Sequence, residues 1–73
     1  MATLDLKQYP NVLRTVRDHG ADVRDARACI LVWQKTHVRS YTLFQQLVKD
    51  EYDVDMPLQF FLDVFEALKI DCR

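Results

Sequence analysis

The most informative segment of the chain is the apolar run Pro57-Leu58-Gln59-Phe60-Phe61-Leu62-Asp63-Val64-Phe65-Glu66-Ala67-Leu68-Lys69-Ile70. Proline is favoured in the first turn of a helix, where its missing N–H leaves no hydrogen bond unmade, so we predict a helix from Pro57 to about Lys69. Its apolar residues form two stripes at helical spacing. The first is an ordinary core stripe of Leu58, Phe61, Leu62, Phe65 and Leu68, and the second, on another side, consists of Phe60, Val64 and Ala67.

Two interpretations of the second stripe are open. A surface helix usually buries an apolar arc somewhat wider than about 100°, whereas the polar residues here are confined to a narrow line at Gln59, Asp63 and Glu66. The helix is either the centre of the domain, with both stripes in one core, or it presents one stripe to a partner. Because 73 residues leave few side chains to wrap a helix on all sides, the second interpretation predicts that Phe60 is exposed in the free chain.

The surface predicted on this basis has apolar anchors and an acidic rim, the usual composition of a protein–protein interface. Its anchors are Phe60, Phe61, Val64 and Trp33, and its rim residues are Asp63 and Glu66. Trp33 is the only tryptophan of the chain, and two roles are open for it, an anchor of the core or an anchor of the interface.

Three further helices are predicted from apolar periodicity and capping residues. They run from about Pro10 to His19, from the N-cap Asp22 to about Thr36, and from the N-cap Ser40 to about Lys49. Gly20, the only glycine, stands where a residue in the left-handed conformation commonly ends a helix. An acidic connector from Asp50 to Asp55 leads to Pro57. We therefore predict one domain, residues 1–73, with an all-α fold of four helices.

The two ends of the chain alternate polar and apolar residues. This alternation runs through Thr3–Lys7 and again through Lys69–Cys72. It is typical of half-buried strands, so the two segments either pair as a minor two-stranded element or stay irregular.

The charged residues are distributed unevenly and bear on nucleic-acid binding. Residues 1–39 contain seven Lys or Arg and four Asp or Glu, whereas residues 40–73 contain three and seven. The order of the last three helices resembles that of a winged-helix or helix-turn-helix domain, whose last helix would enter the DNA major groove. Here that helix carries Asp63, Glu66 and three phenylalanines in place of the basic residues that contact phosphates. The candidates for a basic face elsewhere are Arg14, Arg17, Arg24, Arg27 and Lys35.

Composition and spacing argue against several kinds of chemistry. Cys29 and Cys72 are far apart, and Cys29 lies in an apolar run, where we predict a small buried side chain. Read from Glu51, the acidic connector places Met56 and Leu62 where a calcium loop needs glycine and glutamate. A single glycine is too few for a glycine-rich phosphate-binding loop. From these observations together we predict no metal, no cofactor and no enzymatic activity.

The sequence also bears on the compartment. Hydrophobic residues make up 49 % of the chain and the formal net charge is −1, which favours a folded chain over a disordered one. It contains neither an apolar run of about 20 residues nor an N-terminus with the character of a secretory signal. Together with two thiols that we predict to be free, these features predict a cytosolic protein.

Part of the apolar pattern resembles a known protein family. The residues that carry it are Ile30-Leu31, Thr42-Leu43-Phe44, Leu47, Phe60-Phe61-Leu62 and Ala67-Leu68-Lys69-Ile70-Asp71. This arrangement is similar to the small middle-component subunits of bacterial ABC-three-component systems. The family often has Leu-Leu-Gly before its Lys-Ile pair, whereas Leu68 directly precedes Lys69 here. The resemblance implies a compact helical accessory subunit that bridges a large ABC-type ATPase and an effector in antiphage defence, with no catalytic residue of its own.

We therefore predict a protein that works by protein–protein association, with a large ATPase subunit as one candidate partner. Three alternatives are open. The chain is a small helix-turn-helix regulator that binds DNA through its basic half, or a phage-encoded inhibitor that occupies a protein surface. In the third alternative, the chain associates with itself through the second apolar stripe of the helix that begins at Pro57.

Overall fold

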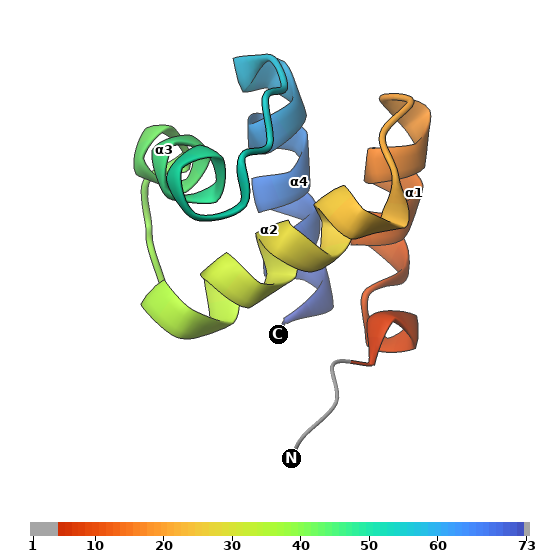
Figure 1. Cartoon of the computed structure of the whole chain (residues 1–73). Helices are drawn as coiled ribbons and strands as arrows, with labels where there is room; N and C mark the ends of the chain where they lie inside the picture. The colour runs from red at the N-terminus through yellow and green to blue at the C-terminus, as the bar shows by residue number, and fades with distance from the viewer. Residues whose placement is uncertain (1–4, 73) are drawn as a thin grey trace.

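The computed structural model describes residues 5–72, which fold as helices around one apolar core (Figure 1). A short 3₁₀ turn, Leu6–Gln8, leads into the first helix. The α-helices of the described residues are α1 (Pro10–Asp18), α2 (Val23–Thr36), α3 (Tyr41–Tyr52) and α4 (Leu58–Asp71). The predicted all-α fold of four helices is confirmed.

α1 and α4 pack side by side and run in opposite directions (Figure 1). The start of α1 is bonded to the end of α4, because Asp71 accepts hydrogen bonds from Asn11 Nδ2 at 2.7 Å and from the Val12 N–H at 3.0 Å. The end of α1 meets the first half of α4, where His19 Nε2 lies 2.8 Å from Asp63 Oδ2. In the same view α2 passes in front of α4, and α3 is seen nearly end-on beside them.

Local chemistry explains the helix starts and the turn after α1. Gly20 has φ +75°, as predicted for the residue that ends α1 in the left-handed conformation. The N–H of Asp22, the N-cap of α2, donates to the Asp25 carboxylate at 3.2 Å. Ser40 Oγ accepts a hydrogen bond from the Leu43 N–H at 3.5 Å at the start of α3. Both predicted N-caps are therefore confirmed.

α3 extends further than its apolar stripe predicts. The stripe ends near Val48, but the helix continues to Tyr52, where Asp53 turns the chain with φ +56°. Its last turn is tied to α2, because Lys35 Nζ donates to Glu51 Oε1 at 3.1 Å. Part of the predicted acidic connector is therefore helical, since polar residues that face solvent extend a helix without adding to its apolar stripe.

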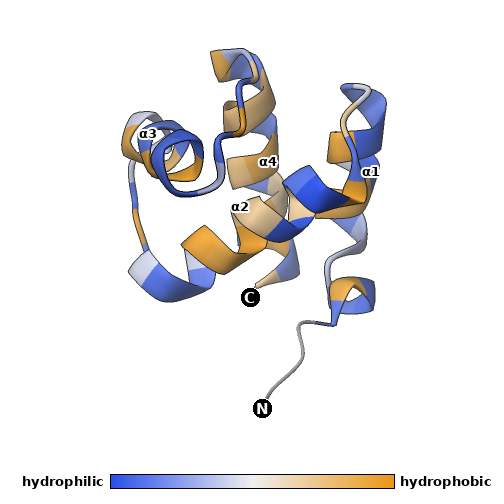
Figure 2. Ribbon diagram, viewed as in Figure 1, coloured by the Kyte–Doolittle hydropathy of each residue, from blue (hydrophilic) through white to orange (hydrophobic). Residues whose placement is uncertain are grey.

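α4 is the centre of the core, and its ribbon is mostly hydrophobic (Figure 2). Its buried residues are Phe60, Phe61, Val64, Phe65, Ala67 and Leu68. On the side of α1, the Phe60 ring meets the His19 ring edge to face, with 5.4 Å between centroids. On the side of α3, Phe61 and Phe65 lie with their centroids 6.2 Å and 5.7 Å from that of Phe44. Residues of both predicted stripes thus belong to one core.

The predicted exposure of Phe60 is therefore wrong. Its side chain is fully buried, whereas Leu58, which we assigned to the core stripe, is 44 % exposed and Leu62 is half-buried. The buried arc is turned toward α1, where His19, directly after that helix, covers Phe60, while Trp33 of α2 and Phe44 of α3 cover the opposite edge. The other three helices are enough to bury Phe60, Phe61, Val64 and Phe65 of α4, although the chain is small.

The described part of the two ends contains no strand, so the predicted alternative of paired strands is wrong there. Leu6–Gln8 is a 3₁₀ turn, and Lys69 to Asp71 form the last turn of α4. Thr3 and Leu4 lie outside the described residues. None of the helices in residues 5–72 has the length and apolar character needed to cross a membrane.

Candidate functional site

The predicted interface anchors on α4 do not form a surface. Phe60, Phe61 and Val64 are all fully buried in the isolated chain. No partner touches these side chains while the domain is folded, because the other helices cover all three of them. That part of the predicted site is wrong, and self-association through the second stripe fails for the same reason.

Trp33, the remaining predicted anchor, is half-buried on α2. Its ring meets that of Phe65 in a T-shaped arrangement with 5.2 Å between centroids. The indole therefore packs against the core, which is one of the two roles left open for it. A role for its exposed part in an interface stays a prediction.

The two predicted rim residues, Asp63 and Glu66, lie in a groove of about 330 Å³ between α1 and α4. Asp63 is held from both sides, by His19 Nε2 at 2.8 Å and by Gln59 Nε2, which donates to Oδ1 at 2.9 Å. These contacts, with His19 first and Gln59 second, lower the pKa of Asp63. Glu66 accepts a hydrogen bond from Lys69 Nζ at 3.4 Å. Both carboxylates are thus engaged within the domain.

Acid is expected to remove the stabilising contribution of the Asp63 carboxylate. The folded pKa lies below the unfolded value of about 3.9, so the contribution is present above that value and is lost as the pH falls through the folded pKa. Because Asp63 is partly exposed, the contribution is below about 1 kcal/mol. Urea denaturation of wild type and Asp63→Asn should show a difference in unfolding free energy at about pH 6 that shrinks at about pH 2.5.

The matched control for this experiment is Glu66→Gln, which removes one negative charge from the same side of α4 without touching His19. A stability difference between wild type and Asp63→Asn that stays the same at both pH values would contradict the assignment.

A second hollow, which we call the arginine pocket, lies between α2 and the end of α3. It has a volume of about 260 Å³ and is lined by Arg24, Arg27, Ala28, Leu31, Tyr52 and Val54. Ala28 and Leu31 follow Arg24 at spacings of four and seven residues, which places them on one face of the helix. Val54 is 6 % exposed and reaches this face because Asp53 turns the chain after α3. The pocket thus has an apolar floor and a basic edge.

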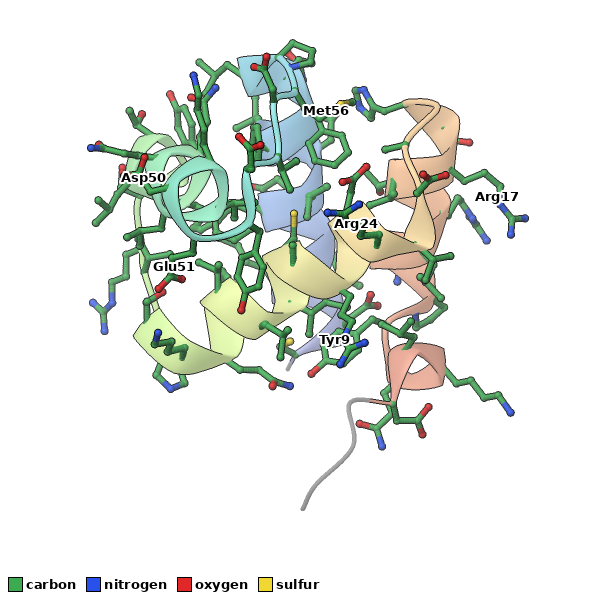
Figure 3. The ribbon with its side chains drawn as sticks, in the orientation of Figure 1. Tyr9, Arg17, Arg24, Asp50, Glu51 and Met56 are labelled. Atoms are coloured by element: carbon green, nitrogen blue, oxygen red, sulfur yellow. The ribbon has the colours of Figure 1, made fainter. Side chains whose placement is uncertain are left out.

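The two arginines of the pocket are free of acidic partners. Within residues 5–72, neither Arg24 nor Arg27 forms an ion pair, whereas Lys35 further along α2 is paired with Glu51. Arg24 lies on the near side of α2 in Figure 3, and Arg17 of α1 points outward from the domain. Arg24 and Arg27 stand in the first two turns of α2, where the helix dipole adds positive potential. The edge of the pocket therefore carries two guanidinium groups that have no ion-pair partner among the described residues.

The cysteines do not add a second candidate site. Cys29 is fully buried, as predicted, and burial followed by the charge of Asp25 raises the pKa of its thiol to about 12. Cys72 is exposed, and desolvation raises the pKa of its thiol as well. A thiol with a raised pKa holds less of the nucleophilic thiolate form. Among the described residues, no group of three or more His, Cys, Asp or Glu is placed to hold a metal ion.

The arginine pocket was only partly visible in the sequence. The sequence indicates Arg24 and Arg27 as candidates for a basic face, and their spacing to Ala28 and Leu31 is a signal for a shared helix face. Tyr52 joins them from a different helix, which no local pattern predicts. Comparisons with protein-family models, with curated proteins and with solved structures give no match. Function is therefore inferred from the chemistry of the pocket.

Proposed function

We propose that this chain is a non-catalytic protein–protein interaction module of the cytosol that docks on its partner through the arginine pocket. The observation that carries the proposal is the pair of unpaired arginines, Arg24 and Arg27, above an apolar floor. Arginine and tyrosine are enriched in protein interfaces, where a few such side chains contribute most of the binding energy. Tyr52, which is 39 % exposed, supplies an aromatic wall of this kind.

The resemblance to middle-component subunits supports a more specific form of the proposal. In that form the chain is an accessory subunit of an ATPase-containing complex in antiphage defence, and its winged-helix-like helix order serves as a scaffold. A phage-encoded inhibitor would use the same docking chemistry on a host complex.

A protein partner is favoured over DNA because of what α4 exposes. In a helix-turn-helix domain the last helix reads the major groove, usually with basic and amide side chains. The exposed or half-buried side of α4 carries Asp63 and Glu66 as well as Gln59 and Lys69, so its charge does not complement a phosphate backbone.

The proposal is tested with a photo-reactive amino acid. We expect p-benzoylphenylalanine in place of Tyr52 to cross-link one protein in cells that express the chain, and mass spectrometry to identify it. The complex is then reconstituted from the two purified components, and its dissociation constant is measured for Arg27→Glu. We expect affinity to fall more than tenfold, because a hot-spot residue typically contributes about 2 kcal/mol or more.

The matched control is Arg17→Glu, which makes the same charge change on α1, at a side chain that points away from the domain (Figure 3). An equal loss of affinity in both variants would indicate a non-specific effect of charge and would overturn the docking site. Affinity that is unchanged in Arg27→Glu would overturn it as well.

A further inference from the structure

The arginine pocket has the size of a site for one side chain. Its volume of about 260 Å³ is below the roughly 300–1,000 Å³ of pockets that take small-molecule ligands or cofactors. Its floor consists of Ala28 and Val54, which are both buried, together with the half-buried Leu31. A large apolar side chain that enters the pocket would therefore meet carbon on the floor and the ring of Tyr52 at the wall.

The two arginines at the edge of the pocket favour a ligand that carries negative charge next to its apolar side chain. Arg24 and Arg27 are three residues apart on one helix, so their guanidinium groups lie on the same face. Basic residues in the first turns of a helix are disfavoured by the helix dipole, and here no acidic residue of the described chain pairs with them. Guanidinium groups bind carboxylates through paired hydrogen bonds, so an acidic ligand would satisfy both.

The surroundings of the pocket limit how much negative charge a ligand brings. Asp50 and Glu51 precede its Tyr52 wall, and Asp53 and Asp55 flank Val54. All four are exposed, and of these only Glu51 is paired within residues 5–72, with Lys35. A nucleic-acid duplex carries a negative charge about every 1.7 Å along its axis and would bring many charges close to these carboxylates. A short peptide segment with one or two carboxylates brings far fewer negative charges near these acidic residues and still supplies partners for Arg24 and Arg27.

We infer that the arginine pocket binds an acidic segment of a partner protein, with one large apolar side chain on its floor and neighbouring carboxylates paired with Arg24 and Arg27. This inference rests on the proposed function and names the chemistry of its partner. The apolar side chain fixes the position of the segment, and the carboxylates supply charge complementarity.

The test uses a fluorescein-labelled peptide with two carboxylates, Ser-Glu-Asp-Phe-Ser-Gly, and the full chain. We expect fluorescence anisotropy to show binding at least tenfold tighter than for the same peptide with serine in place of phenylalanine. A peptide with lysine at every acidic position should not bind. Amide chemical shifts in a ¹H–¹⁵N NMR spectrum should change at Arg27, Ala28, Leu31 and Val54.

Three variants distinguish the pocket from general electrostatics. Arg24→Gln and Arg27→Gln should each weaken binding of the phenylalanine peptide at least fivefold, whereas Arg17→Gln should leave it unchanged. All three arginines are exposed, so circular dichroism should show the same helix content in each variant.

Several results would overturn the inference. Equal binding of the serine peptide would show attraction by charge without the apolar pocket, and stronger binding of a short DNA duplex at the same residues would show a nucleic-acid site. If no peptide binds but the cross-linked complex remains sensitive to Arg27→Glu, the proposed function stands and the acidic-segment inference falls. If both experiments fail, both proposals fall.

Discussion

Substitution of Phe60 by aspartate is expected to unfold the domain at 25 °C. Phe60 is fully buried and packs against the rings of His19 and Phe61 with centroids 5.4 Å and 5.1 Å away. Loss of a buried phenylalanine side chain alone costs about 3–5 kcal/mol. The total stability of a domain this small is about 3–5 kcal/mol, and a carboxylate buried without a partner lowers it further.

The change is measured by far-ultraviolet circular dichroism, in which the helical signal at 222 nm should be lost without denaturant. The matched control is Leu58→Asp, which places the same charge on the same helix at a side chain that is 44 % exposed. Leu58→Asp should keep its helical signal and a cooperative thermal transition. A Phe60→Asp variant that is as helical and as cooperative as Leu58→Asp would contradict the enclosed position of Phe60.

Substitution of Asp71 by alanine is expected to destabilise the domain by about 1–2 kcal/mol, although the residue lies at the end of α4. α1 begins after Tyr9, which offers no side-chain cap, and Asp71 supplies one from the neighbouring helix. Its carboxylate accepts hydrogen bonds from Asn11 Nδ2 at 2.7 Å and from the Val12 N–H at 3.0 Å. Its negative charge also lies at the positive end of the α1 dipole.

Thermal denaturation is the measurement for this variant. In a domain of this size each kcal/mol shifts Tm by roughly 4–8 °C, so Asp71→Ala should lower it by about 4–16 °C. Asp55→Ala removes an exposed carboxylate from the connector before α4 and is the matched control. If the two variants have the same Tm, Asp71 does not cap α1.

The helix positions could be predicted from the sequence because their signals are local. Asp22 and Ser40 are side chains that favour N-caps, and Gly20 is suited to the left-handed residue after α1. These signals act over three or four residues, and they hold in the structure. The end of α3 was missed because Asp50 and Glu51 are exposed helical residues that leave no mark in the apolar pattern.

The environment of α4 could not be decided in the same way. Two apolar stripes are compatible with a central helix and with a helix at an interface, and the outcome depends on how the other helices are placed. α1 lies along Phe60 because Asp71 and His19 bond its two ends to α4. Those contacts join residues 44 and 59 positions apart in the chain, so no periodicity reports them.

The candidate site shows the same limit. The α2 half of the arginine pocket follows from helical spacing, because Arg24, Ala28 and Leu31 share one face. The other half depends on the length of α3 and on the turn at Asp53, which together bring Tyr52 and Val54 to this face. A prediction that ends α3 near Lys49 loses that half of the pocket.

A soluble paramagnetic probe shows whether the apolar face of α4 that carries Phe60 and Val64 is buried in the isolated chain. In a methyl NMR spectrum of the dilute isolated chain, the probe should broaden the methyl signals of Leu58 and Ile70, which are 44 % and 53 % exposed. The methyl signals of Val64, on the same helix and fully buried, should remain sharp. Broadening of the Val64 signals to the extent seen for Ile70 would show that this side of α4 is exposed to solvent and would contradict its burial in the core.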